Sequence, residues 1–189
     1  MSSHHIVREK QEPALLVLGL DNFSDELLGQ LLEWSPTVIT TPQTAEKLAA
    51  HGIKIDWIIG DKFDEELQPD VKRIPAENRT LTRDAIAFLV TNNFPSVNIV
   101  TDEFRLADYR PFADKIDLVV FYNNKKIYPV RTGYNKWKPA GEIIELLTEP
   151  ASVDISGLES IGFSKYQTVA DGFFSLRFEE LFLFIAEEL

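Results

Sequence analysis

The segment Gly52-Ile53-Lys54-Ile55-Asp56-Trp57-Ile58-Ile59-Gly60-Asp61 carries the clearest local signals in this chain. Residues 55–59 form a short apolar run that ends at a glycine and an aspartate. Such a run, bounded by residues that break regular structure, is typical of a buried β-strand. Gly52 favours the end of a helix, because glycine adopts the left-handed backbone conformation found just beyond many helices. The segment therefore predicts a helix end, a loop and a buried strand.

Strand-like and helix-like segments alternate on both sides of this segment. Further strands are predicted at 14–19, 37–40, 71–74 and 96–100. Helices are predicted from Ser24 to about Trp34, from Thr41 to Gly52, and from Thr80 or Thr82 onward. Ser24 and Thr41 are suitable N-caps, and Pro42 suits the first position of a helix. This alternation predicts an α/β domain, with a Rossmann-like, mostly parallel sheet and helices on both faces.

The pattern changes near Asp117. Residues 118–122 and 126–130 predict a β-hairpin, because the intervening Asn123-Asn124 tolerates the backbone of a tight turn. More strand-like runs follow at 143–147, 152–155, 166–169, 173–178 and 181–185. Short strands at this spacing indicate a small C-terminal β-sandwich. We therefore predict two domains, an α/β domain over 1–116 and an all-β domain over 117–189.

The composition restricts the possible partners. A net charge of −11 and a pI near 4.7 argue against general binding to nucleic acid or anionic membranes, which requires clustered Lys and Arg. No apolar run approaches the ~20 residues that span a bilayer, and we expect a cytoplasmic protein. The absence of cysteine excludes disulfides and thiolate chemistry. A local Arg or Lys still permits a phosphate ligand.

An acidic group follows the strand at 55–59. It consists of Asp61, Asp64, Glu65 and Glu66, with Lys62 among them. Carboxylates at the carboxyl end of a strand are suitable ligands for Mg²⁺ and, through it, a nucleotide. A solvated acidic turn is the alternative interpretation.

Two further groups lie at predicted strand ends or helix starts. Glu77-Asn78-Arg79-Thr80 enters a helix, where backbone N–H groups and Arg79 can receive an anion. This segment is alternatively an ordinary capping loop. Arg105 and Asp108 follow the strand at 96–100, and they either act on a ligand or pair with each other.

Together these motifs resemble those of the thiamin pyrophosphokinase family. The segment 52–61 is similar to the family pattern Gly-Ile-Lys-Pro-Asp-x-Ile-Ile-Gly-Asp, and the opening 2–16 resembles one bacterial branch. The segments 60–64, 76–81 and 104–109 align with the family's three remaining motifs, and the closing strands fit in place and length. The resemblance covers nearly the whole chain and is strongest over 1–61.

The resemblance implies a reaction in which thiamine and ATP give thiamine diphosphate and AMP. It also implies a homodimer that binds thiamine at the subunit interface and uses Mg²⁺. Carried over to this chain, the catalytic residues are Asp61 and Asp108, and the metal ligands are Asp61 and Asp64. The nucleotide and phosphate ligands are Asn78, Arg79, Thr80 and Arg105.

The chain departs from the family at several acidic positions. Pro42, Ala76 and Leu81 stand where the family motifs have aspartate, and Asp64 is displaced by one inserted residue. Because neither proline, alanine nor leucine can ligate a metal, we expect the diphosphokinase activity to be weakened or lost. Glu65, Glu66 or Glu77 are possible replacement ligands. The alternatives are a non-catalytic dimer that binds a nucleotide, a thiamine compound or a protein partner, and a diphosphotransferase for another alcohol.

Overall fold

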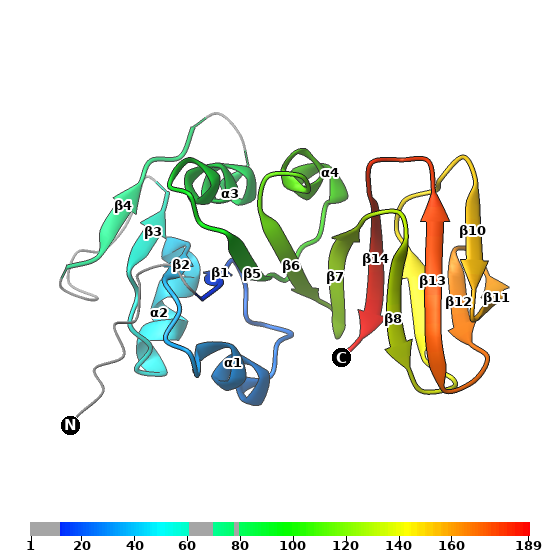
Figure 1. The fold of residues 1–189 in the computed structure, drawn as a ribbon. Helices are drawn as coiled ribbons and strands as arrows, with labels where there is room; N and C mark the ends of the chain where they lie inside the picture. The colour runs from blue at the N-terminus through cyan, green and yellow to red at the C-terminus, as the bar shows by residue number, and fades with distance from the viewer. Residues whose placement is uncertain (1–11, 61–69, 78–79) are drawn as a thin grey trace, which may run out of the picture. The chain divides into compact units, whose positions relative to one another are not determined.

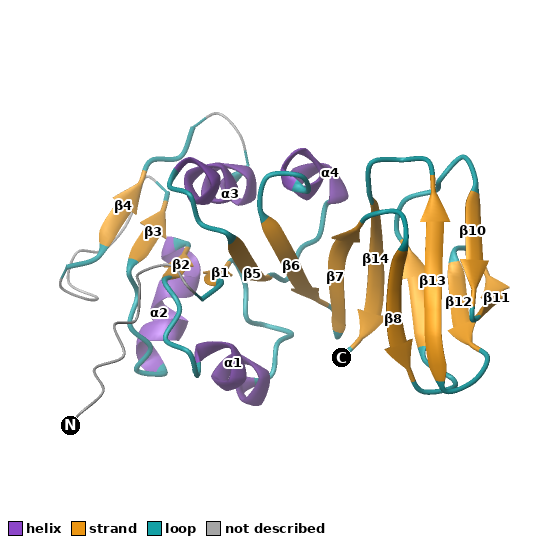
Figure 2. Cartoon of the chain, viewed as in Figure 1, coloured by secondary structure: helices purple, strands orange, loops and turns teal. Residues whose placement is uncertain are grey.

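The computed structural model describes residues 12–60, 70–77 and 80–189. The chain divides into two compact units, Met1–Leu118 and Val119–Leu189. Within the described residues, the helices all belong to the first unit, and the second consists of strands and loops (Figure 2). The functions predicted for the two parts stay predictions.

The first unit contains a parallel sheet with the strand order β5-β1-β2-β3-β4. Its strands are β1 (Ala14–Val17), β2 (Val38–Thr40), β3 (Trp57–Ile59), β4 (Lys72–Ile74) and β5 (Ser96–Val100). The central strands β1 and β2 are buried along their whole length, as expected for a parallel sheet covered on both faces. The predicted parallel α/β arrangement is therefore confirmed.

Three helices connect these strands. They are α1 (Asp25–Leu32), α2 (Pro42–Ala50) and α3 (Leu81–Thr91), and α3 lies on the opposite side of the strands from α1 and α2 (Figure 1). The side chains of Ser24, Thr41 and Thr80 each accept a hydrogen bond from a backbone N–H three residues on. These side chains satisfy N–H groups that have no partner within the helix. The predicted caps at Ser24 and Thr41 are confirmed, and Thr80 rather than Thr82 caps α3.

The second unit is built from antiparallel strands, and β6 (Asp117–Tyr122) runs into it from the first unit. One sheet has the order β11-β12-β9-β14-β7-β6, and the other has the order β10-β13-β8. The remaining strands are β7 (Lys125–Val130), β8 (Tyr134–Lys138), β9 (Ile143–Leu146), β10 (Val153–Ser156), β11 (Leu158–Gly162), β12 (Lys165–Thr168), β13 (Gly172–Phe178) and β14 (Leu183–Glu188). The predicted hairpin turn is confirmed, because Asn123 and Asn124 both have positive φ.

Both sheets of the second unit contribute to one hydrophobic cluster. Its buried members come from β7, β9 and β14 of one sheet and from β13 of the other: Val130, Ile144, Leu146, Phe174, Leu176, Phe178, Leu183 and Ile185. Tyr128 and Tyr134 pack against it. The inward positions alternate along each strand, as the period of two requires.

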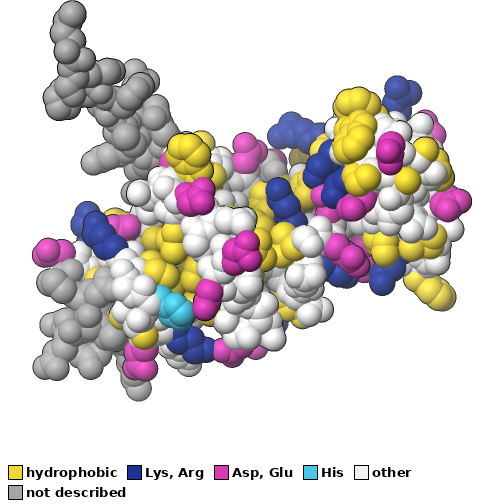
Figure 3. Space-filling view, turned by 90° about the horizontal axis from the view of Figure 1, so that it is seen from below, with side chains coloured by type: hydrophobic (Ala, Val, Ile, Leu, Met, Phe, Trp, Pro, Cys, Tyr) yellow, Lys and Arg dark blue, Asp and Glu magenta, His cyan; other side chains and the backbone are white. Residues whose placement is uncertain are grey.

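Some elements were not predicted. They are the short helix α4 (Leu106–Tyr109), the 3-10 turn η1 (Arg110–Phe112), and the strands β8 and β11. Lysine and arginine side chains are interspersed with aspartate and glutamate on the face shown in Figure 3. None of the helices in the described part of the chain combines the length and apolarity needed to cross a bilayer.

Candidate functional site

The carboxyl ends of β1 and β2 are joined by buried hydroxyl groups. Thr40 Oγ1 donates to the Val17 carbonyl at 2.8 Å, and Thr44 Oγ1 donates to the Leu18 carbonyl at 3.3 Å. Both threonines are at most 5% exposed. Buried hydroxyl groups need hydrogen-bond partners, and both of these have one. The two bonds connect the ends of β1 and β2 and the start of α2.

Asp102 connects the loop after β5 to the loop after β1. Its carboxylate accepts from the Asp21 N–H at 3.0 Å, from the Asn22 N–H at 3.1 Å and from Asn22 Nδ2 at 3.4 Å. Gly19 permits this approach, since a Cβ there would lie 2.2 Å from Asp102 Oδ2. Asp102 follows the predicted strand at 96–100, but sequence reasoning missed this role, and no spacing motif marks it.

An exposed ion pair lies beside this loop. Lys47 on α2 pairs with Asp21, and the hydrogen bond between them raises the pKa of the lysine. Both side chains remain more than half exposed. The pair therefore leaves a solvent-accessible carboxylate and ammonium group above the end of β1.

Thr80 and Asp108, both predicted site residues, are brought together. Thr80 Oγ1 donates to Asp108 Oδ1 at 3.0 Å, and the same oxygen accepts from the Arg83 N–H at 3.3 Å. The contact joins the start of α3 to α4. It leaves Asp108 Oδ2 outside this bond, so the carboxylate can still accept from a ligand.

The Arg105 side chain pairs with Glu103 rather than with Asp108. Its Nη2 is 3.6 Å from Glu103 Oε2, and both side chains are highly exposed. The suggested pairing between Arg105 and Asp108 is therefore wrong. An exposed ion pair of this kind contributes little and exchanges readily, so Arg105 can turn to an anionic ligand.

The side chain next to Asp108 is a buried tyrosine. Tyr109 is 1% exposed and stacks on Phe104 with ring centroids 5.1 Å apart. Burial, and then the charge of Asp108, raise the pKa of Tyr109 far above its ordinary value. The phenol therefore stays protonated at neutral pH and cannot serve as a base there.

A second buried carboxylate organises the loop that precedes α3. Asp84 is 5% exposed, and its Oδ2 accepts from the Glu77 N–H at 2.8 Å. No sequence pattern indicates this role, because Asp84 resembles an ordinary first-turn acid of α3. The Glu77 side chain is exposed. Glu77 is therefore anchored through its backbone N–H.

Pro42 lies beside the residue that precedes Asp61. A Cβ on Gly60 would lie 3.2 Å from Pro42 Cδ, and Gly60 has φ +137°, which favours glycine. The Gly60 N–H donates to the Ile74 carbonyl at 3.2 Å. The position where the resemblance implies an aspartate therefore borders Gly60, the residue before Asp61. Asp61, Asp64, Glu65, Glu66, Asn78 and Arg79 lie outside the described residues.

The described part of the site does not by itself fit a magnesium ion. Within residues 12–60, 70–77 and 80–189, no three His, Asp or Glu side chains come together as metal ligands. Asp102 already accepts three hydrogen bonds, and Pro42 offers no ligand atom. Any metal at these strand ends would therefore need ligands from outside the described residues, where Asp61, Asp64, Glu65 and Glu66 lie.

The comparison with solved structures identifies the fold, whereas the comparisons by sequence match nothing. No protein-family model and no curated protein sequence matches the chain. Among solved structures, thiamine pyrophosphokinase from Bacillus subtilis aligns with TM-score 0.70 and 14% identity over 93% of this chain and 98% of that one. Yeast thiamin pyrophosphokinase aligns with TM-score 0.67 and 12% identity over 96% and 87%. The Candida albicans enzyme gives 0.66 and 13% over 94% and 89%.

The chain thus has the fold of the thiamin pyrophosphokinases over nearly its whole length. The resemblance stated from the motifs is confirmed at the level of the fold. Identities of 12–14% are those of a divergent sequence on a shared fold. Because folds host several functions, activity must be argued from the site.

Proposed function

We propose that this chain is a thiamin pyrophosphokinase-type protein with a reduced set of metal ligands. The reaction would transfer a diphosphate group from ATP to the hydroxyl of thiamine, giving AMP and thiamine diphosphate. The main support is the fold match, which covers 93% of the chain and 98% of the Bacillus subtilis enzyme. It includes both the parallel sheet and the antiparallel strands, so no large part of that scaffold is missing.

The strand ends of the first unit would hold the reacting phosphates. Thr80 and Asp108 already contact each other, and Arg105 is exposed beside them. Asn78 and Arg79 precede Thr80 in the chain and would add donors for phosphate oxygens. In such transfers, positioned cationic groups stabilise charge on the migrating group. Asp108 would orient a donor on a substrate, and Asp61 with Asp64 would supply carboxylates for Mg²⁺.

The rest of the proposal follows the family scaffold. The second unit would form a β-sandwich, since both of its sheets contribute to one hydrophobic cluster. Two copies of the chain would form a homodimer and bind thiamine where they meet, in the cytoplasm. Trp137, which is 53% exposed on β8, has an accessible aromatic face suited to stacking on a thiamine ring.

A non-catalytic relative is the second candidate, and Pro42 favours it. Its ring borders Gly60, where the family would have a carboxylate directed at the acidic loop. Ala76 and Leu81 remove two more carboxylates. Such a protein would bind a nucleotide, a thiamine compound or a protein partner without diphosphate transfer.

Product formation distinguishes these candidates. The protein is incubated with ATP, MgCl₂ and thiamine, and AMP and thiamine diphosphate are quantified by mass spectrometry. A working enzyme should lose about 10²–10³ in rate on Asp61→Asn or Asp108→Asn, as expected for loss of one electrostatic stabiliser. Asp114→Asn, beyond η1, is the matched control and should keep the parent rate.

Two other outcomes are informative. No product, together with a melting temperature raised by thiamine or ATP, would establish the non-catalytic candidate, because a ligand that binds the native state stabilises it. No product and no stabilisation by either compound would contradict the diphosphokinase, and it would reduce the second candidate to a protein that binds only a protein partner.

A further inference from the structure

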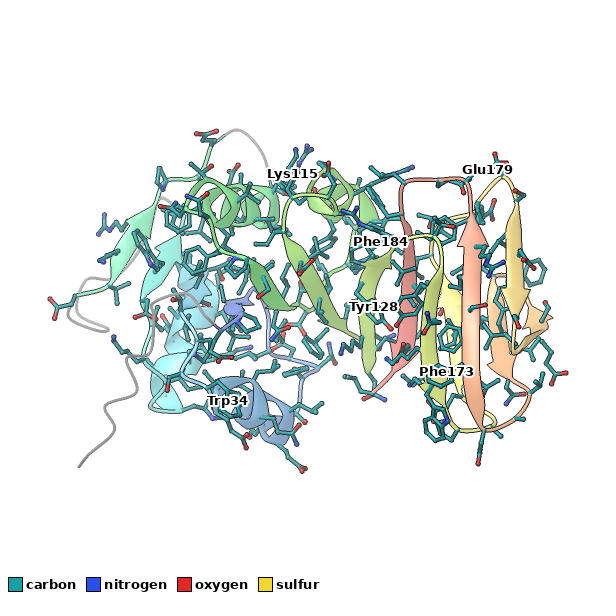
Figure 4. All side chains as sticks on the ribbon, in the orientation of Figure 1. Trp34, Lys115, Tyr128, Phe173, Glu179 and Phe184 are labelled. Atoms are coloured by element: carbon teal, nitrogen blue, oxygen red, sulfur yellow. The ribbon has the colours of Figure 1, made fainter. Side chains whose placement is uncertain are left out.

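At one end of the second unit, the hydrophobic cluster is replaced by charged groups. Alternating residues of β7 face the cluster, and their partners on β14 face the same way. The pairs are, in order, Val130 with Leu183, Tyr128 with Ile185, and Lys126 with Glu187. The apolar inner face therefore ends in a lysine and a glutamate. Figure 4 shows Tyr128 among the side chains of this region.

Strand β8 of the facing sheet brings two more lysines to the same place. Tyr134 packs against the hydrophobic cluster, and Lys136 and Lys138 follow it at alternate positions. Lys138 pairs with Gly172 of β13, which has no side chain to fill the adjacent space. We refer to Lys126, Lys136, Lys138 and Glu187 as the lysine cluster.

Glu187 is the acceptor at the centre of the lysine cluster. It is 4% exposed, and its carboxylate receives Lys136 Nζ at 2.7 and 2.8 Å and Lys138 Nζ at 2.9 Å. Tyr128 also donates to it, and the Tyr128 and Tyr134 hydroxyls are 2.9 Å apart. Burial alone would raise the pKa of Glu187, but the donors outweigh it and hold the pKa below its ordinary value. The buried glutamate is therefore ionised and fully engaged.

The positive charges exceed the negative ones. Lys138 is shared between Glu187 and Glu142, the latter at 3.2 Å, and Lys136 pairs with Glu187. Among the described residues, no carboxylate lies within ion-pair distance of Lys126. Lys126 Nζ lies 5.7 Å from the centre of the Tyr128 ring, and Lys136 Nζ lies 5.6 Å from it. Three ammonium groups thus meet two carboxylates, and Lys126 carries the surplus charge.

The surplus positive charge on Lys126 is unfavourable in the protein without a ligand. Burial lowers the pKa of Lys126, and the charges of Lys136 and Lys138 lower it further, against the attraction of Glu187. A half-buried ammonium without a counter-ion is costly to keep, and ionisable groups perturbed in this way are concentrated at functional sites. An anion with several acceptor oxygens is the complementary ligand, since each ammonium offers three donors.

We propose that Lys126, together with Lys136 and Lys138, binds a phosphate-type oxyanion at this end of the second unit. Lysine binds phosphate as a point charge without the fixed geometry that arginine imposes. One phosphate would supply Lys126 with its missing negative charge and accept from the donors that surround Tyr128. The same chemistry is offered by free phosphate and by the terminal phosphate of a diphosphate compound.

Titration calorimetry with inorganic phosphate, at constant ionic strength set by NaCl, tests this site. We expect saturable binding that weakens about tenfold or more in Lys126→Met, as loss of one charge-assisted hydrogen bond predicts. Lys125→Met is the matched control, because Lys125 is the next residue of β7 and pairs instead with Glu145 at 2.5 Å. Lys126→Arg should retain most of the affinity.

Stability in phosphate-free buffer separates a binding role from a structural one. Lys126→Met should then be at least as stable as the parent, because it removes a desolvated and repelled charge, and it should lose the stabilisation that phosphate gives the parent. The same titrations with inorganic diphosphate and with ATP show whether the site takes free phosphate or the phosphate of a larger compound. The ligand whose affinity falls most between parent and Lys126→Met is the one that this site prefers. Absence of phosphate and diphosphate binding, or equal affinity in parent and Lys126→Met, would overturn the proposal.

Discussion

Charged side chains have different partners in the two units. In the first, the carboxylates at the strand ends bind neighbouring loops, as Asp102 does with the N–H groups of residues 21 and 22. In the second, a carboxylate and two lysines form ion pairs within the inner face, with Glu187 4% exposed. The carboxylate of Asp102 in the first unit therefore fixes the position of a loop backbone. The lysine cluster in the second unit instead contains more positive than negative charges.

This difference matters for the functions proposed for the two units. In the first unit, Gly19 and Gly60 permit the close approach of neighbouring groups, while Pro42, Ala76 and Leu81 stand where the resemblance implies aspartates. Under the proposed function, the scaffold of the site would be present while part of its set of metal ligands is missing. The lysine cluster has the reverse character, because its charged groups are present while burial and the charges of Lys136 and Lys138 disfavour the ammonium of Lys126.

The largest effect is expected at Glu187. Glu187→Gln would leave Lys136 and Lys138 without their buried carboxylate, and removal of one partner of a buried pair costs about 3–5 kcal/mol of unfolding free energy. Urea denaturation measures the loss, and amide hydrogen exchange in β14 shows whether it falls in the second unit. Glu188→Gln, the next and exposed residue, is the control and should change stability little.

The same residue predicts a pH dependence. Because its pKa is lowered in the folded protein, Glu187 stabilises the fold above the ordinary glutamate pKa. That stabilisation disappears as the pH falls through the lowered value. Glu187→Gln should have a flatter dependence of stability on pH in this acidic range, and an unchanged slope would contradict the assignment.

A smaller effect is expected at the loop after β1. Gly19→Ala would place a Cβ 2.2 Å from Asp102 Oδ2 and 2.9 Å from the Asp102 backbone nitrogen, so the backbone must shift. We expect a loss of about 1–3 kcal/mol, as for other overpacked positions. Gly29→Ala is the matched control: nothing lies within 4 Å of its Cβ, and in α1 it should stabilise by about 0.5–1 kcal/mol. Equal effects of the two substitutions would show that the approach of Asp102 is unimportant.

Much of the fold was predictable because its signals are local. The caps at Ser24 and Thr41 and the turn at Asn123-Asn124 depend on residues within a few positions of one another. Strand β8 was missed because its inward positions carry lysines, so the expected apolar alternation is absent. Those lysines are stabilised by Glu187, about 50 residues later in the chain. Helix α4 was missed because four residues hold too little periodicity to detect.

The candidate site was predictable only in part. Thr80 and Asp108 were selected from separate motifs, and the structure brings the two side chains into contact. The roles of Asp102 and Asp84 depend on loops that fold back on them, and neither has a spacing signal. Single-sequence reasoning identifies residues at strand ends, but it does not show which loop each side chain will bind.

Restoring the missing carboxylates tests most directly the claim that the scaffold is intact and its metal ligands are reduced. The variant Pro42→Asp/Ala76→Asp/Leu81→Asp places acids at the first positions of α2 and α3, where negative charge suits the helix N-terminus, and in the loop after β4. A matched variant with asparagine at the same three positions has the same side-chain shape without the charge. The account predicts that the aspartate variant forms thiamine diphosphate at least about tenfold faster than both the parent and the asparagine variant. A folded aspartate variant that is no faster than either would contradict it.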